Sequence, residues 1–548
     1  MIFDSVKTEA DLGKLKKRMF KDESLKKKMI GIRDGMRFRP NLASLQASNK
    51  IPLPNNAELF VLYKEMVESG EQKKILDVEK LLRKIKTKSN SGVAVVSLLT
   101  KPFPCPGRCT YCPTESNMPK SYLSKEPAAA RALLNDFDPY RQINMRLKAL
   151  EFNGHPTDKV EMIVIGGTWS FYHSVYQEEF MAECFRACNN YGRSKEEQIA
   201  KGEKTLDELQ AINETAKNRI VGLSIETRPD YINLREIEKL RRLGVTKVEI
   251  GVQHLDNDIL ELTKRDMTTE ESAVATEILR DNGFKVVYHM MPNLPGSNTQ
   301  KDIDMFGELF AGKKYQPDML KIYPCMVLEG SELYEEWRGG KFKAYTDKEL
   351  LDVLIGAKKQ VPPYVRILRV IRDIPATYIK EGSKISNLRQ HLDLDMEKNG
   401  WQCKCIRCRE VRDSDLDLKD FELKKIEYDT ENGKEVFLSF EHISTGKLAS
   451  FLRLRLPSKK AENNQLSVLR GATLVRELHT YGRMAVLSQK GEQSQHLGFG
   501  KRLLLEAEKI SKGGGYGKVA VISGVGVRGY YRQRGYELKD TYMVKSLI

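Results

Sequence analysis

The chain has 548 residues, 40% of them hydrophobic and 30% charged, which is too long for one ordinary core and predicts two or three domains. It contains no long uncharged apolar run and no secretory signal pattern, which excludes a membrane span and predicts a cytoplasmic protein. Its 91 lysines and arginines against 75 acidic residues give a net charge of +16, which favours a polyanionic partner, although a solvated basic surface has the same composition.

Residues 1–85 predict a small basic module that is mostly helical. Two lysine-rich stretches, "LGKLKKRMFKDESLKKKM" and "NAELFVLYKEMVESGEQKKILDVEKLLRKIK", have apolar residues at helical spacing. The segment between them is turn-rich and is expected to be irregular.

Residues 86–385 predict an α/β domain of parallel βα units. Helical stretches that end in glycine, such as "LREIEKLRRLG" and "ESAVATEILRDNG", alternate with short strand-like runs. These runs are "SGVAVVSLLT", "KVEMIVIGG", "NRIVGLSIET", "VTKVEIGVQ", "FKVVYHMMP", "MLKIYP" and "YVRILRVIRDIP". The pattern fits an open sheet or a partial or full barrel, and in a barrel the chemistry lies at the C-terminal ends of the strands.

Residues 386–420 form a cysteine-containing linker, and residues 421–548 predict an α+β domain. This domain begins with two strands around a turn in "KEVFLSFEHISTGKLASFLRLRLP". Further strands and the helix "KRLLLEAEKISK" follow.

Six of the nine cysteines form two triads, and the first triad, Cys105, Cys109 and Cys112, directly follows the first predicted strand. Three closely spaced thiolates can hold three irons of a 4Fe-4S cluster and leave the fourth iron without a protein ligand. The sequence "CPGRCTYC" resembles the radical S-adenosylmethionine (SAM) superfamily, in which SAM chelates that iron and is cleaved to a 5′-deoxyadenosyl radical. A zinc site with a distant fourth ligand is the alternative.

By the same resemblance, the SAM pocket lies at the ends of the strands. Gly166, Gly167 and Thr168 in "VIGGTWS" would form the backbone edge that binds the SAM amino group. Further polar side chains at strand ends would line the pocket, although each one alone also fits a buried structural pair. These are Glu226, Arg228, Glu249, Gln253 and His289.

The second triad, Cys403, Cys405 and Cys408, has no βα pattern before it. We expect a closed structural zinc site that fixes the angle between domains, with His391 or Cys325 as fourth ligand. An unmetallated cysteine-rich loop is the alternative. The helical spacing of Cys184 and Cys188 predicts core packing.

The last domain contains a Q-x-x-G-x-G motif, Gln495 to Gly500, immediately before its helix. Backbone amides at a helix N-terminus suit a pyrophosphate. The order of strand, motif, helix, strand and Y-x-x-x-G-Y resembles the GNAT acetyltransferases, which bind acetyl-CoA. A tyrosine at the position of Tyr531 would then protonate or hydrogen-bond the thiolate leaving group, whereas a core aromatic is the alternative. A Rossmann site is disfavoured because the third glycine and the downstream acid are missing.

The combination closely resembles the family of the catalytic subunit of Elongator, in an archaeal or bacterial single-chain form. The resemblance rests on "KPFPCPGRCTYCP", "VIGGTWS", "IETRPD", "EIGVQ", "HMMPNLPG", "RELHTYG", "QHLGFG" and "AVISGVG". It implies formation of 5-carboxymethyluridine at the wobble uridine of tRNA. In the mechanism proposed for that family, the deoxyadenosyl radical takes hydrogen from the acetyl methyl, the carbon radical adds to uracil carbon 5, and the thioester is hydrolysed.

The resemblance also assigns residues and partners. Tyr531 and Lys159 would be catalytic, and acetyl-CoA would contact Lys159, Glu477, Leu478, His479, Thr480, Gln495, Gly498, Phe499, Gly500, Lys501 and Tyr531. The tRNA would lie across the N-terminal module and the barrel face, bound largely through phosphates. An electron donor is required, and a homodimer is possible. Compared with eukaryotic members of the family, the spacing between the first two cysteines of the first triad is shorter. In the second triad, Cys405 and Cys408 stand where eukaryotic members have other residues.

Two other functions compete with this interpretation. A protein lysine acetyltransferase with a structural SAM and cluster domain would have an acidic pocket for its lysine substrate. The net positive charge of the chain disfavours this function. A radical SAM enzyme for another RNA reaction, such as methylthiolation, would need no acetyl-CoA site.

Overall fold

The computed structural model describes residues 92–385, 387–412, 416–481 and 498–547, together with Phe60, Tyr63, Lys64, Val67, Ser69 and Gly70. The chain divides into two compact units, one of residues 1–90 with 145–157 and one of residues 91–144 with 158–548. In the first unit, a Cβ at Gly154 would lie 3.1 Å from the Phe60 ring, so glycine permits this close packing. Apart from those six residues, the predicted helical module lies outside the described residues.

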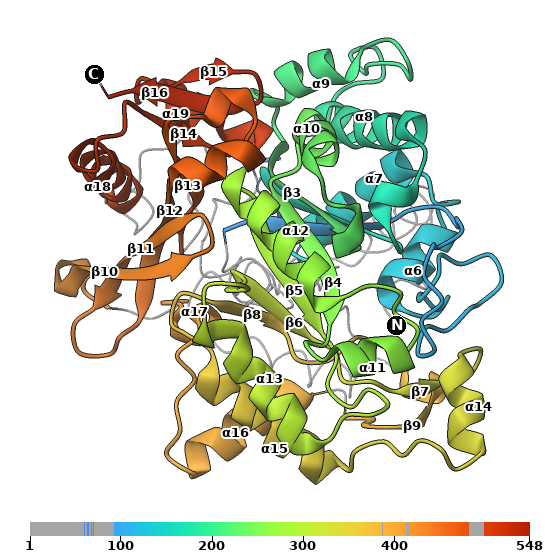
Figure 1. Cartoon of the computed structure of the whole chain (residues 1–548). Helices are drawn as coiled ribbons and strands as arrows, with labels where there is room; N and C mark the ends of the chain where they lie inside the picture. Colours follow the sequence, from blue (N-terminus) through green and yellow to red (C-terminus); the bar gives the residue numbers. More distant parts are fainter. Residues whose placement is uncertain are drawn as a thin grey trace, which may run out of the picture. The chain divides into compact units, whose positions relative to one another are not determined.

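The second unit contains an open parallel sheet of seven strands in the order β1-β2-β3-β4-β5-β6-β8 (Figure 1). The strands are β1 (Ala94–Leu99), β2 (Lys159–Ile165), β3 (Arg219–Thr227), β4 (Lys247–Gln253), β5 (Lys285–Met290), β6 (Met319–Ile322) and β8 (Arg366–Arg369). All adjacent strands pair in parallel, and no pairing of β8 with β1 occurs among the described residues. The predicted βα barrel is therefore confirmed in its partial form.

Helices connect these strands, and threonine caps define where several of them begin. The helices are α6 (Pro127–Leu133), α7 (Pro139–Phe152), α8 (Ser174–Asn190), α9 (Leu206–Asn213), α10 (Leu234–Arg242), α11 (Asn257–Leu262), α12 (Thr269–Asp281), α13 (Thr299–Ala311), α14 (Glu332–Arg338) and α15 (Asp347–Gln360). Thr205, Thr268 and Thr346 each form a capping box with a glutamate three residues later, which satisfies backbone N–H groups at the starts of α9, α12 and α15. Cys184 and Cys188 are buried in α8, which confirms their predicted packing.

The concave face of the parallel sheet carries charged side chains. Lys247 of β4 reaches Glu161 of β2 at 2.5 Å, across the intervening strand β3. Lys321 of β6 pairs with Glu249 of β4 across β5. Strands two positions apart are separated by roughly 10 Å, so such side chains meet where the sheet curves toward them. The interior of the partial barrel is therefore polar and charge-balanced.

A second, mixed sheet has the order β10-β11-β12-β13-β14-β16-β15. Its strands are β10 (Phe421–Thr430), β11 (Gly433–His442), β12 (Leu448–Pro457), β13 (Ala472–Thr480), β14 (Lys518–Val521), β15 (Glu537–Lys539) and β16 (Tyr542–Ser546), with the helices α18 (Phe499–Gly513) and α19 (Arg528–Arg532). A bulge at Arg476 interrupts the β12–β13 register. The parallel pairing of β13 with β14 ends at Val475, so β13 continues beyond its neighbour and leaves an unpaired edge. The predicted separate α+β domain is confirmed.

Two further strands, β7 (Val327–Leu328) and β9 (Ile379–Glu381), form a small antiparallel pair, and the helices α16 (Leu388–Lys398) and α17 (Ile406–Arg409) lie on the segment that leads to the mixed sheet. Short 3-10 helices complete the unit: η3 (Trp169–Phe171), η4 (Pro229–Tyr231), η5 (Ala376–Tyr378), η6 (Leu418–Asp420), η7 (Lys459–Asn464), η8 (Ser467–Leu469) and η10 (Val525–Val527). No helix among the described residues is both long and apolar enough to cross a membrane.

Buried arginines join the mixed sheet to the barrel. Arg455 of β12 donates to Asp281 at the end of α12 at 2.9 Å, and Arg476 of β13 pairs with Asp318 just before β6 at 2.5 Å. Glu435 of β11 pairs with both arginines. Because these groups are 0–1% exposed, breaking one pair leaves an uncompensated buried charge.

We predict that Arg455→Met lowers the thermal unfolding midpoint strongly, because it strands Asp281 at a cost of about 3–5 kcal/mol. Lys313→Met is the matched control, since Lys313, in the loop before β6, also pairs with the mixed sheet, at Asp429 of β10 and a distance of 3.7 Å, but both side chains are more than half exposed. That variant should unfold near the wild-type temperature. Equal losses in calorimetry of the two variants would contradict this account of the junction.

Candidate functional site

The first cysteine triad and the glycine pair lie together at the C-terminal ends of β1 and β2. The Thr100 hydroxyl donates to the Gly166 carbonyl at 3.1 Å, which holds the two strand ends in register. Gly166 has φ +131°, and a Cβ there would lie 2.0 Å from the Thr100 Oγ1. The sulfur of Cys105 is 3.7 Å from the hydroxyl oxygen of Thr168. The structure thus places the predicted SAM-binding edge directly beside the cysteine loop.

Within the cysteine loop, a tight turn places Cys112 against Cys109, with the Cys112 amide donating to the Cys109 carbonyl at 3.1 Å. A hydrogen bond from Cys112 and the nearby Arg265 guanidinium lower the pKa of the Cys109 thiol to about 5. All three thiols are free. Three free thiols at the end of parallel strands, with a low-pKa sulfur beside a cation, fit the donor set of a 4Fe-4S cluster.

A network of carboxylates and cations lies deeper in the barrel. Glu249 accepts from Ser224 at 3.0 Å, lies 3.0 Å from the His289 Nε2, and pairs with Lys321. Burial alone would raise the pKa of Glu249, but Lys321 and His289 outweigh it and hold the pKa far below its usual value. Glu226 accepts from the Tyr122 hydroxyl at 2.6 Å. The ligand atoms of Glu226, Glu249 and His289 lie within 4.8 Å of one another, but Lys321 already supplies the balancing cation, so no metal is needed there.

Two residues predicted for the SAM pocket take part in structural hydrogen bonds, Arg228 through its side chain and Gln253 through its backbone. The Arg228 guanidinium donates to Asp230 at 2.9 Å and to the backbone carbonyls of Arg265 and Asp266 at 3.0 Å. Gln253 ends β4 with φ +71°, and its carbonyl accepts from the Met291 amide at 2.7 Å. Arg228 therefore braces the loop after α11, and Gln253 shapes the bulged end of its strand.

Most of the residues predicted to bind acetyl-CoA lie on the mixed sheet and its helices, whereas Lys159 lies on the barrel. Glu477, Leu478, His479 and Thr480 form the end of β13 that β14 does not cover. Gly498 begins α18 with φ +74°, and Gly500 lies so close to Tyr530 that a Cβ would be 3.1 Å from its hydroxyl. Phe499 is buried against Phe440, with ring centroids 4.4 Å apart, while Lys501 is exposed. Gln495 lies outside the described residues.

This region lies at the N-terminal ends of the barrel strands, opposite the cysteines. A Cβ at Gly524 would be 2.1 Å from the Val221 carbonyl, so the segment before η10 packs directly on the start of β3. Lys159 opens β2, at the other end of the strand from Gly166, and burial lowers its pKa. The charges of Lys247, Lys285 and His479 all act on Glu161 and, against its burial, lower its pKa to about 2.

Tyr531 lies in α19 with its ring buried edge-on against Tyr530 and Tyr536, at centroid distances of 5.2 Å and 5.8 Å. Its hydroxyl has no hydrogen-bond partner among the described residues. Burial raises its pKa well above the usual value, so the group stays protonated at neutral pH. The ring packs as a core aromatic would, and the hydroxyl is available to donate to a ligand.

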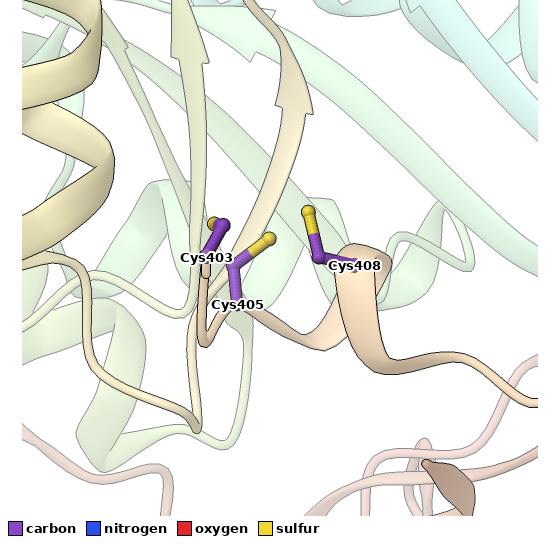
Figure 2. Close-up of side chains that lie close together, drawn as sticks. All are labelled: Cys403, Cys405 and Cys408. Atoms are coloured by element: carbon purple, nitrogen blue, oxygen red, sulfur yellow. The ribbon is translucent and has the colours of Figure 1, made fainter. Parts of the chain in front are cut away.

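The second triad lies on the linker between β8 and the mixed sheet (Figure 2). The sulfurs of Cys403, Cys405 and Cys408 lie within 4.8 Å of one another, and hydrogen bonds from the other two thiols lower the pKa of Cys405. Neither proposed fourth ligand joins this group. His391 is exposed on α16, and Cys325 packs in the apolar cluster of Cys109 and Tyr111, beside the first triad. The prediction of Cys325 is therefore wrong, because the βα order carries it to the other cysteine site.

Several charged residues of the site were not predicted. Arg265 beside Cys109, and Glu161, Lys247, Lys285 and Lys321 inside the barrel, had no assigned role. A signal existed for Lys247, since "KVEIGVQ" begins by alternating charged and apolar residues with the period of a strand whose two faces differ. Arg265 follows a short helix and has no such pattern.

Comparisons with known proteins give the family of the barrel and relatives that cover most of the chain. Residues 104–308 match the radical SAM superfamily, and residues 317–398 match the radical SAM C-terminal domain. A tRNA uridine(34) acetyltransferase of Methanocaldococcus infernus is 43% identical over 509 residues, covering 90% of this chain and 92% of the relative. Elongator complex protein 3 of Homo sapiens is 37% identical over 487 residues, covering 85% of this chain and 87% of the relative.

A solved structure extends this likeness to three dimensions. The archaeal Elp3 of Methanocaldococcus infernus, with an N-terminal deletion of residues 1–46, matches with a TM-score of 0.71 and 41% identity. The match covers 83% of this chain and 99% of that chain, so it spans the barrel and the mixed sheet together.

We predict that Gly166→Ala abolishes SAM binding and lowers thermal stability more than Gly167→Ala does. Both glycines have positive φ, at a cost of about 1–3 kcal/mol for alanine, but the nearest atom to a Cβ at Gly167 is 4.0 Å away. Equilibrium dialysis with SAM and thermal melts measure the two effects. Indistinguishable variants would show that the contact with Thr100 is unimportant.

Proposed function

The chain belongs to the family of the tRNA uridine(34) acetyltransferases and Elongator complex protein 3, and we propose that it forms 5-carboxymethyluridine at the wobble uridine of tRNA by radical SAM chemistry. Acetyl-CoA is the acetyl donor. The observation that carries the proposal is that the mixed sheet, which includes the free end of β13, is joined by Arg476 and the segment before η10 to the barrel that holds the first cysteine triad.

A 4Fe-4S cluster held by Cys105, Cys109 and Cys112 would supply, with SAM, the 5′-deoxyadenosyl radical. The chain's own residues orient the reactants. The backbone of Gly166 and Gly167 and the hydroxyl of Thr168 border the cysteine loop and would bind the SAM amino group. Between the two binding regions, the buried lysines Lys247 and Lys321 are each paired with a glutamate, so neither presents an unpaired charge to the reactants.

On the mixed sheet, Tyr531 would donate its hydroxyl proton to the thiolate of coenzyme A. Lys159 and His479 would contact the acetyl-bearing end of the molecule, and the start of α18 at Gly498 would bind the pyrophosphate through backbone amides. Uracil carbon 5 is a poor nucleophile, so acetyl transfer alone would not modify it. A radical source and an acetyl-CoA site within one compact unit of the chain would meet that chemical requirement.

A protein lysine acetyltransferase is disfavoured by the charges around β13. Such an enzyme needs an acidic pocket for its cationic substrate, but Glu477 already pairs with Arg453 at 2.9 Å. Lys285 adds a further positive charge beside Glu477. The local electrostatics therefore suit an anionic partner better than a lysine.

We further propose zinc at the second triad and a four-part division of the chain. The parts are a tRNA-binding module at 1–85, the radical SAM domain at 86–385, the zinc linker at 386–420 and the GNAT domain at 421–548. Cys408 lies two residues before Glu410, which pairs with Arg366 of β8, so a bound zinc would stiffen the connection between the sheets. The electron donor, a homodimer and the cytoplasmic location stay predictions.

The proposed reaction is tested with anaerobically reconstituted protein, tRNA, acetyl-CoA, SAM and dithionite, followed by mass spectrometry of the nucleosides. We expect 5-carboxymethyluridine from the wild type, none from Cys109→Ala, and slower acetyl-CoA turnover with Tyr531→Phe, which lacks the proton donor. Absence of the modified nucleoside together with acetyl-lysine on a protein substrate would refute the proposal. Unchanged acetyl-CoA turnover by Tyr531→Phe would show that Tyr531 has only a packing role.

For the second triad, metal analysis of purified protein should find zinc in the wild type and in His391→Ala. Cys408→Ser should lose it, because removal of one of three thiolates opens the site. Zinc retained by Cys408→Ser, or lost by His391→Ala, would overturn this assignment of ligands.

A further inference from the structure

Arg265 is a buried arginine that is held against the first cysteine triad. Its residue is 6% exposed. The Nη1 atom donates to the Cys109 sulfur at 3.6 Å, and the Nη2 atom donates to the Gly251 carbonyl at 2.5 Å. A Cβ at Gly251 would lie 2.9 Å from the Nη2 atom, so the glycine leaves room for the guanidinium. These contacts give the positive charge a fixed position beside a cluster ligand.

Arg265 also lacks a carboxylate partner among the described residues, which distinguishes it from the arginines around it. Arg228 pairs with Asp230 at 2.9 Å, and Arg108 pairs with Asp266 at 3.4 Å. The buried Nε atom of Arg265 has no hydrogen-bond partner in the same described part of the chain. Burying an unpaired cation costs several kcal/mol, so a compensating negative charge is expected on the side of the guanidinium that faces Cys109.

We propose that Arg265 is a positioning residue that raises the reduction potential of the cluster by donating to the Cys109 sulfur. The inference rests on the proposed function, because it requires the cluster at the first triad. Reduction adds one electron to the cluster, supplied by a one-electron donor that is thereby oxidised. Hydrogen bonds to ligand sulfurs and nearby charge set the potentials of such clusters. A fixed cation in a buried site favours the more negative, reduced state.

The chain offers a matched control one residue before Cys109. Arg108 is on the same loop and carries the same charge, but its side chain is 78% exposed and pairs with a carboxylate. Water and ions screen such a charge strongly. Removing the charge of Arg108 should therefore leave the potential near that of the wild type, whereas removing that of Arg265 should not.

The test is a redox titration of the full chain, reconstituted anaerobically and followed by electron paramagnetic resonance, with iron and sulfide content measured first. We expect Arg265→Gln to shift the potential to more negative values, and Arg265→Lys and Arg108→Gln to stay near the wild type. A wild type that takes up no iron would reject the proposed function itself. A wild type with a cluster and an unshifted Arg265→Gln would overturn this inference alone.

Loss of the cluster from Arg265→Gln is also informative. If Arg265→Lys then keeps a cluster of near-wild-type potential, the positive charge is what the site requires, and the inference stands. The inference fails if both variants fold, as judged by circular dichroism, but neither binds iron. It also fails if the reduction potential of Arg265→Lys becomes more negative, as expected for Arg265→Gln. In either case the shape of the guanidinium, and not its charge, is what the site requires.

Discussion

The buried pairs of Arg455 with Asp281 and of Arg476 with Asp318 fix the position of the mixed sheet on the barrel. They join the mixed sheet to the N-terminal side of the barrel through groups that water does not reach. Charges buried this deeply tolerate little movement, because each loses its partner if the sheets separate. The free end of β13 and the cysteine loop after β1 therefore belong to one compact unit of the chain.

The bulge at Arg476 connects this junction to the free end of β13. It lies where β13 leaves β14, so the same residue both anchors the strand on Asp318 and begins its free end. Along this free end, Glu477 pairs with Arg453 of β12 and the charge of His479 acts on Glu161 of β2. Leu478 and Thr480 lie on the opposite face of the strand, beside Gly500 of α18.

Much of this could be predicted from the sequence, because short apolar runs between glycine-capped helices specify a parallel sheet. Strand β10 was missed, since its charged sequence "ELKKIEYDT" lies on a sheet edge where burial imposes little pattern. Both triads were recognised from local spacing. Arg265 and the position of Cys325 were not, because they meet the first triad through tertiary packing from distant segments. Tyr531 was assigned without its helix, α19, which is too short to show a period.

The central claim is that the two sheets act in one reaction, and acetyl-CoA deuterated on its methyl group tests it most directly. In the presence of tRNA, SAM and reductant, mass spectrometry should find deuterium in the 5′-deoxyadenosine released, because in the proposed reaction the SAM-derived radical takes its hydrogen from the acetyl methyl. Unlabelled 5′-deoxyadenosine accompanied by modified uridine would contradict the account, since the acetyl group would then never have met the radical.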